Sequence, residues 1–461
     1  MARESRPPGG LPHVVIVGGG FGGLSAARAL SRAPVRVTLI DRTNHHLFQP
    51  LLYQVATTVL SPAQIAAPMR HLLRKQANVT VLMTEVLGVD TKNRVVSFGD
   101  PAPATGALAY DFLIVATGAS GSYFGHDEWA RVAQYPKTVA DVLKMRDKIL
   151  KLFEAAELEG DPSRHRDLLT FVLVGAGPTG VEMAGALATM TRATLRSEFR
   201  RIDPAASRII LVDAGPRILA AYSDALAGKT RRYLERMGVD VRTGARVEHV
   251  DDDGVVVDNE RIRSRCVFWT AGVHASPAGT WLGVPTDHAG RVSVLPDLTV
   301  SGHPEIFVVG DTASIQHDGR PLPGVAQVAI QSGPHAGRTI ARTVAGEAAR
   351  APFHYFDKGN LATVSNTFAI LEKGRWHLSG VPAKFIWAFM HVLYLSGFEN
   401  RLLVLLEWIW AMLTRRRGAR LIEDPSYSQL AAAMAPRAGP TSPASRTAVT
   451  PDNHPIPSRT S

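Results

Sequence analysis

The sequence predicts an α/β protein made of two Rossmann-like dinucleotide-binding domains, one inserted in the other, followed by a C-terminal helical segment at a membrane interface. The first observation behind this prediction is a β–glycine turn–α–β unit that occurs twice, beginning near His13 and near Leu168. The second is an apolar, tryptophan-rich stretch at residues 381–414. A chain of 461 residues is long enough for two or three such units.

The first unit begins with a β-branched run at residues 14–17, which leads into Gly18-x-Gly20-x-x-Gly23. The first glycine permits a tight turn, the second lets the backbone approach a pyrophosphate, and the third lets the helix pack on the strand. The free N–H groups at the helix start then face the anion. Asp41 ends the next β run, where its carboxylate can accept the hydroxyls of a ribose. Together these features favour nucleotide binding over a plain glycine-rich turn.

The second unit contains Gly175-x-Gly177-x-x-Gly180, and its candidate acid is Asp213. The separation between Gly175 and Asp213 is longer than the usual spacing of about 20 residues between the first glycine and the acid. We expect a helix running from Thr179 to about residue 200 to account for the excess. If Asp213 meets the ribose, it repels a 2′-phosphate and favours NADH over NADPH. The alternative is that Asp213 is only a turn residue at the end of its strand and does not contact a nucleotide.

Charge and cysteine content limit the function classes. The net charge is +10 and the pI is about 9.8, which favours acidic partners. Arg415, Arg416, Arg417 and Arg420 follow the apolar stretch directly, so anionic lipid is favoured. No nucleic-acid partner is expected, because no zinc-finger, RRM or KH pattern occurs. The single cysteine, Cys266, excludes a disulfide framework, a Cys-bound cluster and a redox dithiol, and we expect it to be a packed core thiol. We expect no metal site.

Two dinucleotide sites without a dithiol constrain the route of the electrons. We expect FAD in one site and NADH in the other, with a hydride passing from NADH to the flavin. The electrons must then leave for an external acceptor, which is oxygen, a carrier protein or a lipid-soluble quinone. The apolar C-terminal stretch favours the quinone.

That stretch holds two apolar runs of 11 and 12 residues, at 385–395 and 402–413. As helices they reach about 16–18 Å, roughly half of a bilayer core, so neither spans it. Tryptophans near a basic cluster are typical of helices that lie in the membrane interface. A helix pair buried in a homodimer contact is the alternative. The N-terminus lacks a signal-peptide pattern, so we expect a peripheral protein on the cytoplasmic face of the cell membrane.

Several polar residues are candidates for the chemistry. Gln327 and Gln331 lie four apart, on one face of a helix, and are either solvated or donors to quinone carbonyl oxygens. Gly310–Asp311 ends a strand, where the carboxylate binds a flavin ribityl hydroxyl or caps a helix. Glu182 either benefits the helix dipole or faces the nicotinamide, and the pattern favours neither.

These residues resemble the type II NADH:quinone oxidoreductase family over residues 12–425. The resemblance rests on "NHHLFQPLLYQVAT" at 44–57, "GVE" at 180–182, "GD" at 310–311 and "AQVAIQ" at 326–331. It implies a single-subunit flavoprotein that sits on the membrane by a C-terminal helical segment and does not pump protons. It also implies that Gln327 and Gln331 line the quinone pocket and that Glu182 is a catalytic carboxylate near the nicotinamide. The predicted cofactor-binding residues are Gly18, Gly19, Gly20, Phe21, Gly22, Gly23, Asp41, Arg42, Val86, Thr117, Gly118, Gly310, Asp311 and Ala326 for FAD, and Gly175, Gly177, Gly180, Asp213 and Gly272 for NADH.

The expected domain order follows from these assignments. Residues 1–120 and 285–357 form the FAD-binding domain, and 121–284 form the inserted NADH-binding domain with its core at about 168–275. Residues 358–425 form a small sheet and the anchoring helices, and 426–461 form a disordered proline-rich tail. Sulfide:quinone oxidoreductases and disulfide reductases need more cysteines than this chain has. A soluble flavin reductase of a carrier protein and an NADH-responsive signalling flavoprotein stay open as alternatives.

Overall fold

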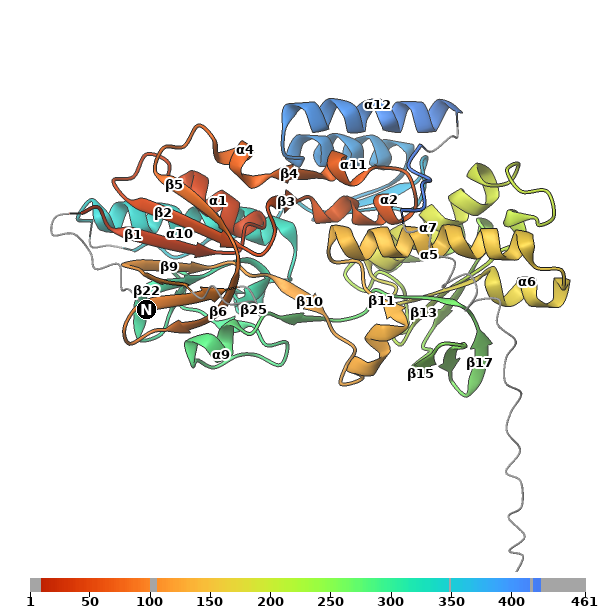
Figure 1. Ribbon diagram of the computed structural model, residues 1–461, viewed down its shortest axis with the longest axis horizontal. Helices are drawn as coiled ribbons and strands as arrows, with labels where there is room; N and C mark the ends of the chain where they lie inside the picture. The colour runs from red at the N-terminus through yellow and green to blue at the C-terminus, as the bar shows by residue number, and fades with distance from the viewer. Residues whose placement is uncertain (1–9, 100–105, 348–349, 415–417, 424–461) are drawn as a thin grey trace, which may run out of the picture.

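The computed structural model describes residues 10–99, 106–347, 350–414 and 418–423. Two α/β lobes lie side by side, and two C-terminal helices lie along one side of the molecule, over α2 (Leu52–Ala56) and the neighbouring part of the second lobe (Figure 1). The predicted fold class, with two Rossmann-type sheets, is confirmed. The expectations for Arg415–Arg417 and for the tail at 426–461 concern residues outside these ranges.

The first lobe is built on a six-stranded sheet in the order β21-β22-β9-β1-β2-β5. Its neighbouring strands are parallel apart from the β21–β22 pair. Helix α1 (Phe21–Ala29) and helix α10 (Ala326–Val344) pack together on this sheet. A side chain at Gly333 of α10 would overlap the carbonyl oxygen of Gly22, so this close approach requires glycine. The strands are β1 (His13–Val17), β2 (Arg36–Asp41), β5 (Val79–Met83), β9 (Phe112–Val115), β21 (Thr299–Val300) and β22 (His303–Val308).

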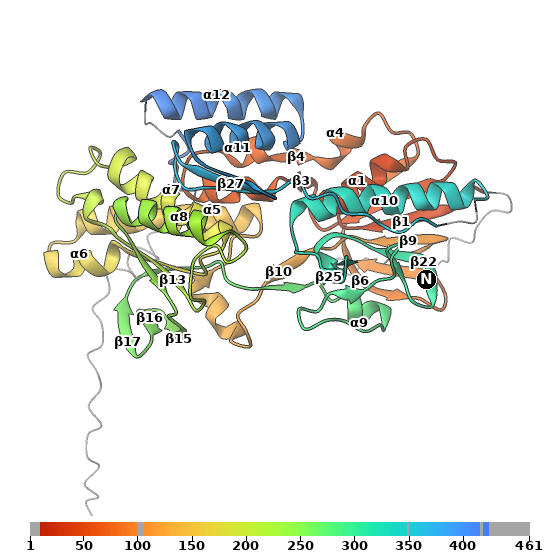
Figure 2. The ribbon, with the colours of Figure 1, turned by 180° about the vertical axis from the view of Figure 1, so that it is seen from behind.

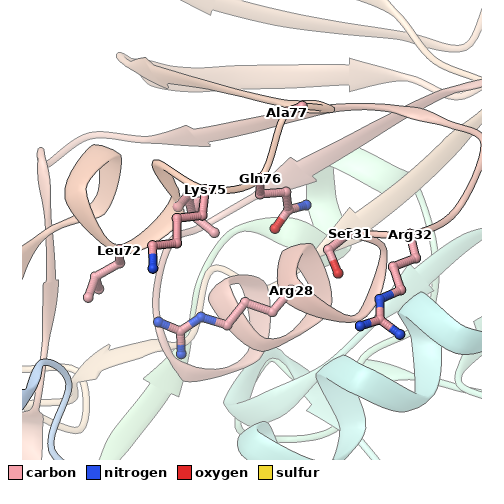
Figure 3. A pocket seen from close by; sticks show the side chains of 8 residues that line it. Arg28, Ser31, Arg32, Leu72, Lys75, Gln76 and Ala77 are labelled. Carbon is pink, nitrogen blue, oxygen red and sulfur yellow. The ribbon is translucent and has the colours of Figure 1, made fainter.

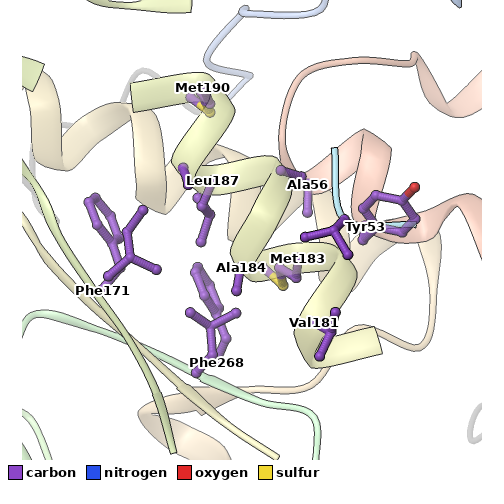
Figure 4. Close-up of a cluster of buried hydrophobic side chains, with 14 of the residues drawn as sticks. Tyr53, Ala56, Phe171, Val181, Met183, Ala184, Leu187, Met190 and Phe268 are labelled. Carbon is purple, nitrogen blue, oxygen red and sulfur yellow. The ribbon is translucent and has the colours of Figure 1, made fainter. Parts of the chain in front are cut away.

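The second lobe is built on a five-stranded parallel sheet in the order β11-β18-β12-β13-β14. Helix α7 (Pro178–Thr189) packs its apolar face on this sheet. Figure 4 shows Met183 and Leu187 of α7 among aromatic side chains of the strands, with Tyr53 of the first lobe close by. The two lobes therefore share one apolar cluster. The elements are β11 (Ala133–Gln134), β12 (Thr170–Val174), β13 (Arg208–Asp213), β14 (Val239–Thr243), β18 (Cys266–Trp269), α5 (Val139–Leu158), α6 (Pro162–Leu168) and α8 (Asp224–Arg236).

The helix predicted to reach about residue 200 is shorter. It ends at Thr189, and one π-helical turn follows at Met190–Thr194. The segment expected at the end of this helix is held in another way, because the Glu157 carboxylate of α5 accepts the backbone N–H groups of residues 200–202 at 2.9–3.2 Å. A carboxylate that binds these N–H groups offers the backbone a stable alternative to continuing the helix.

Two short strands carry the chain between the lobes. Strand β10 (Ala119–Gly121) pairs antiparallel with β19 (Val273–Ala275). Directly after β19, helix α9 (Ala278–Leu282) packs in the apolar cluster of the first lobe. Smaller elements complete the lobes: β3 (His45–Leu47), Gln49–Leu51, α2 (Leu52–Ala56), α3 (Pro62–Ile65), β4 (Ala66–Pro68), α4 (Met69–Leu73), β6 (Glu85–Asp90), β7 (Val95–Gly99), β8 (Gly106–Ala109), Asp127–Arg131, Pro204–Ala206, β15 (Val247–Asp251), β16 (Gly254–Val257), β17 (Glu260–Arg263), β20 (Val292–Ser293), Gly310–Thr312, β23 (Ala313–Ser314), β24 (Gln316–His317) and β25 (Arg320–Pro321).

The C-terminal unit begins with the predicted small sheet, formed by β26 (Asn360–Thr363), β27 (Ala369–Lys373) and β28 (Trp376–Gly380). Helices α11 (Val381–Tyr394) and α12 (Phe398–Thr414) follow. The Trp408 indole of α12 donates to the Gln54 side chain of α2 at 2.8 Å, which fixes α12 to the first lobe. Within the described ranges, no helix is long and apolar enough to cross a membrane.

Candidate active site

The two glycine turns have nearly the same backbone geometry. Gly18 and Gly175 have φ angles of 102° and 103°, a region that favours glycine. A side chain at Gly23 would overlap the carbonyl oxygen of Gly18, and one at Gly180 would overlap that of Gly175. By contrast, nothing lies within 4 Å of where a side chain would start at Gly20, which caps α1. This open space at a helix N-terminus fits the pyrophosphate of a dinucleotide.

The two strand-end acids also correspond. Asp41 accepts the N–H of Gly19 at 2.6 Å with one oxygen and the N–H of Thr43 at 2.7 Å with the other. Asp213 accepts the N–H groups of Ala176 at 2.6 Å and Gly215 at 2.7 Å in the same way. Each carboxylate thus lies against its glycine turn. Because a carboxylate oxygen can accept a second hydrogen bond, both can still bind a ribose hydroxyl.

Asp311 lies between the two lobes. Burial raises the pKa of its carboxyl, while the charges of Lys137 and Arg291 act in the opposite direction. Burial lowers the pKa of Lys137, which also feels Asp311 and Arg42. Lys137 Nζ donates to Gln49 of the first lobe at 3.2 Å. Lys137 therefore brings a cation to the predicted flavin residues. Nothing in the local sequence around Lys137 marks it as a site residue, so it could not be predicted.

Other predicted FAD residues lie close together after the ends of β9 and β22. Gly118 N–H donates to the Thr312 hydroxyl at 2.7 Å, and the Thr117 hydroxyl lies 3.3 Å from the same oxygen. Gly310 and Asp311, which directly precede Thr312, adjoin α10. A side chain at Gly310 would meet Ala329 of α10 at 3.1 Å, and Ala326 is the first residue of that helix.

Three further predicted residues lie on other elements. Val86 is buried in β6 among the apolar residues of the first lobe. Arg42 is exposed directly after β2. Gly272 precedes the crossing strand β19 with φ of 69°, and a side chain there would meet the Phe124 ring at 2.5 Å.

Gln327 and Gln331 share one binding partner, the segment 355–359. Gln327 donates to the carbonyl of Gly359 at 2.8 Å and accepts the N–H of Lys358 at 3.1 Å. Gln331 donates to the carbonyl of Phe356 and accepts its N–H, both at 3.0 Å. Both side chains are half-buried. Their common helix face is confirmed, and it holds the segment that leads into the C-terminal sheet.

Glu182 faces the C-terminal unit. Its carboxylate accepts the N–H of Thr363 at 3.2 Å, and the Lys384 amino group of α11 donates to the Thr363 hydroxyl at 3.0 Å. Lys384 also lies 3.9 Å above the ring centroid of Trp387. Burial raises the pKa of Glu182 and lowers that of Lys384, and the charge of each partly opposes the shift of the other. The sequence analysis missed Lys384 because it is about 200 residues from Glu182.

A row of rings leads from the first glycine turn to the C-terminal helices. Phe21 lies edge-on to Phe48 with centroids 5.7 Å apart, and Phe48 lies edge-on to His391 of α11 at 6.0 Å. His391 stacks on Trp387 at 4.1 Å, and Trp387 contacts Trp408 of α12 at 5.1 Å. Burial lowers the pKa of His391 to about 4, so the ring is neutral at pH 7. Within the described ranges, no group of three or more metal-ligating side chains lies together.

Fold and site together define a class: an oxidoreductase with two dinucleotide-binding domains. A family profile described as pyridine nucleotide-disulphide oxidoreductase matches residues 12–333. The expected core thiol is confirmed, since Cys266 is fully buried and burial raises its pKa to about 12.

Known proteins narrow this class. The type II NADH:quinone oxidoreductases Ndh and NdhA of Mycobacterium tuberculosis are each 45% identical to this chain, over 92% and 91% of it and 94% and 91% of their own lengths. The solved structure of NDH2 from Plasmodium falciparum in complex with NADH has a TM-score of 0.81 at 18% identity, covering 88% of this chain and 99% of that one. The sulfide:quinone oxidoreductase of Aquifex aeolicus has a TM-score of 0.68 at 17% identity, covering 85% and 91%. The chain belongs to the type II NADH:quinone oxidoreductase family.

Proposed function

We propose that the protein oxidises NADH through noncovalently bound FAD and reduces a membrane quinone, at the cytoplasmic face of the membrane and without proton pumping. The observation that carries this proposal is the pair of matching dinucleotide turns in a chain of this family whose single cysteine is buried. Without a dithiol, electrons have no acceptor within the protein's own side chains. The family resemblance supports the lack of proton pumping.

The first turn is the proposed FAD site. The open space at Gly20 takes the pyrophosphate, and Asp41 binds the ribose. Asp311 lies beyond, where its carboxylate binds the ribityl chain and Lys137 offsets its charge. Ala326 begins α10 beside this site, so the helix N-terminus stabilises negative charge on the flavin. When bound, FAD supplies the ring that takes a hydride from NADH and passes the electrons to quinone.

The second turn is the proposed NADH site. Pyrophosphate binds at the start of α7, and Asp213 binds the adenosine ribose. Its carboxylate repels a 2′-phosphate, so NADH is preferred over NADPH. Gly272, on the segment that returns to the first lobe, lines the approach to the flavin.

The quinone site is proposed between α10 and α11. Gln327 keeps one amide hydrogen beyond its bond to Gly359, and this hydrogen can be donated to a quinone carbonyl. Phe48 and the neutral ring of His391 give the passage an apolar wall that a quinone ring tolerates. Lys384 lies near the start of α11, on the helix face that carries Trp387 and His391. With Glu182 of α7, the carboxylate expected near the nicotinamide, it can hold protons between the two substrate sites.

The bilayer surface is the proposed partner of α11 and α12. Their outward side chains are large and apolar, with exposed fractions of 65% for Phe389 and 73% for Leu413. Exposed apolar faces of this extent mark an interaction surface. A homodimer through the same helices is the alternative, and vesicle binding separates the two because a dimer contact would be satisfied without lipid.

The division into domains remains part of this proposal. Residues 1–120 and 285–357 hold FAD, 121–284 hold NADH, and 358–425 bind the membrane. The return crossing at β19 and the packing of α9 on the first lobe support an inserted second domain.

Stopped-flow kinetics of the two half-reactions test the proposal. The purified protein should carry FAD that acid releases, and NADH should bleach its flavin absorbance. Gln327→Ala should leave that reduction nearly intact and slow reoxidation by a short-chain quinone about two- to twelvefold, the worth of one neutral hydrogen bond. Gln331→Ala should have a smaller effect, because Gln331 lies further from the start of α10.

Gln316→Ala in β24 is the matched control, since Gln316 is exposed and lies outside α10. It should change neither half-reaction. Slow flavin reduction with normal reoxidation in both α10 variants would reverse the placement of the two substrates. If quinone does not reoxidise the wild-type flavin at all, the proposed function is wrong. The protein would then reduce a soluble carrier protein or act as an NADH-responsive signalling flavoprotein.

A further inference from the structure

A basic hollow lies on the first lobe, outside the dinucleotide sites. It has a volume of about 450 Å³ and lies between the C-terminal end of α1 and the segment after α4. Figure 3 shows Arg28 and Lys75 reaching toward the same space, with Ser31 and Arg32 in the turn after α1. None of its lining residues is acidic. The hollow therefore has the charge of an anion site.

The cations in the hollow are not neutralised from nearby. Within the described ranges, Arg28, Arg32 and Lys75 form no ion pair at 4.0 Å or less, and all three are exposed. Partial burial and the nearby charge of Arg401 in α12 both lower the pKa of Arg28. Like charges held together without a counter-ion destabilise one another, so a bound anion would relieve the repulsion.

The hollow lies beside the proposed membrane surface. Helix α4 lies on the same side of the molecule as α11 and α12 in Figures 1 and 2. Arg28, near the end of α1, lies close enough to Arg401, in the first turn of α12, for the two positive charges to repel each other. If α11 and α12 rest on a bilayer, the hollow is at the level of the lipid head groups.

We propose that the hollow formed by Arg28, Ser31, Arg32 and Lys75 binds the phosphate of an anionic phospholipid head group. This inference rests on the proposed membrane association and adds a lipid class to it. Arginine binds phosphate through two parallel N–H bonds, and lysine contributes a point charge. Ser31 adds a neutral donor, and Leu72 gives the glycerol end an apolar contact. The hollow is within the size range of small-ligand pockets.

Vesicle co-sedimentation of the full-length, flavin-loaded protein tests the proposal. One set of vesicles contains phosphatidylcholine only, and the other contains phosphatidylcholine with phosphatidylglycerol. The wild type should prefer the anionic vesicles. The double variant R32Q/K75Q should lose roughly 10- to 30-fold in partitioning onto anionic vesicles at low salt and little on neutral ones, since each surface cation adds about fivefold. High salt should shrink the difference.

The matched control is K92Q/R320Q, which removes the same charge from the turn after β6 and from β25. Both side chains are exposed, and those elements lie away from α12 in both ribbon views. The control should keep most of the preference for anionic vesicles. An equal loss in both double variants would mean that total charge drives binding, and the proposal would be wrong. Flavin content confirms that each variant is folded.

A second arm distinguishes the lipid from free phosphate. Inorganic phosphate should release the protein from anionic vesicles no better than sodium chloride at the same ionic strength. Stronger release by phosphate would identify a soluble anion as the ligand and overturn the lipid assignment. Equal binding of the wild type to both vesicle types would also overturn it, while leaving membrane association intact. Binding to neither would remove the membrane association itself, independently of the quinone assay.

Discussion

The two dinucleotide-binding units share their turns but differ in what covers their helices. Gly18 and Gly175 agree in φ to within a degree, and Asp41 and Asp213 accept equivalent N–H groups at 2.6 Å. Such agreement between segments of different sequence shows that local chemistry determines the turn. A strand, a glycine turn and a strand-end acid are sufficient to form it.

The elements that pack on α1 and α7 come from distant parts of the chain. Helix α1 packs on α10, the helix with the two glutamines, through Gly22 and Gly333. Helix α7 packs on the C-terminal sheet, where a side chain at Gly185 would overlap the carbonyl oxygen of Val364. The first unit is therefore joined to the proposed quinone helix, and the second to the proposed membrane unit. Two turns of the same geometry are therefore proposed to bind different nucleotides, because different elements pack beside them.

The largest expected effect comes from the glycine that packs each helix on its turn. Gly23→Ala should abolish stable FAD binding, because the new methyl group overlaps the Gly18 carbonyl and displaces the turn. Gly180→Ala should keep the flavin and slow its reduction by NADH roughly 5- to 150-fold, since overpacking costs about 1–3 kcal/mol. Flavin content and stopped-flow reduction measure the two outcomes. Flavin loss in Gly180→Ala alone would interchange the sites.

Substitution of the two strand-end acids, Asp41 and Asp213, should distinguish the two units by a smaller effect. Asp213→Asn keeps the side-chain size but removes the charge that faces a 2′-phosphate, so the ratio of kcat/KM for NADPH to that for NADH should rise roughly tenfold. Asp41→Asn is the matched variant, and it should weaken FAD retention without changing nucleotide preference. Comparable kcat/KM for both nucleotides in the wild type would contradict the role of Asp213.

Sequence reasoning succeeded where the signal is local. The turns at Gly18 and Gly175 and the small sheet after residue 358 follow from short patterns of glycine and alternating apolar residues. It failed for the end of α7, because the residues expected to continue that helix are held by Glu157 of another helix. It also missed Lys137 and Lys384, because each gains its importance from an acid that only folding brings near.

The glutamines show the same limit at finer scale. Their spacing correctly placed them on one face. It did not indicate that this face holds the backbone of residues 356–359, because a pattern within one helix carries no information about a segment about 25 residues further on. Whether they also bind quinone stays a prediction.

The polar contact between α7 and the C-terminal unit provides the next test. Ser25 in α1 occupies the position that Glu182 occupies in α7, two residues after the third glycine of each turn. Glu182→Gln and Lys384→Gln should each slow turnover roughly tenfold while FAD stays bound, because each leaves a buried partner without its counterpart. The double variant should be no slower than the worse single variant. Ser25→Ala is the control and should change turnover little. Fully additive losses would show that the two groups act independently.

The smallest expected effect is a pH dependence of the Tm that comes from His391 in α11, the helix that covers the second unit. His391 of α11 has a pKa lowered to about 4 by burial, whereas its ordinary value is 6.5. Between these values the unfolded chain binds the proton and the folded protein does not, so this group's stabilisation is complete above pH 6.5 and is lost as the pH falls toward 4. The Tm of the wild type should therefore fall more between pH 7.5 and 5 than that of His391→Phe, by a few degrees, which corresponds to roughly 1–3 kcal/mol. The raised pKa of Glu182 acts in the opposite sense over the same range, but it is present in both proteins and cancels in the difference. Phenylalanine keeps the stacking on Trp387 and removes the proton site. Parallel Tm curves for the two proteins would show that His391 keeps an ordinary pKa and that α11 is open to water at this point.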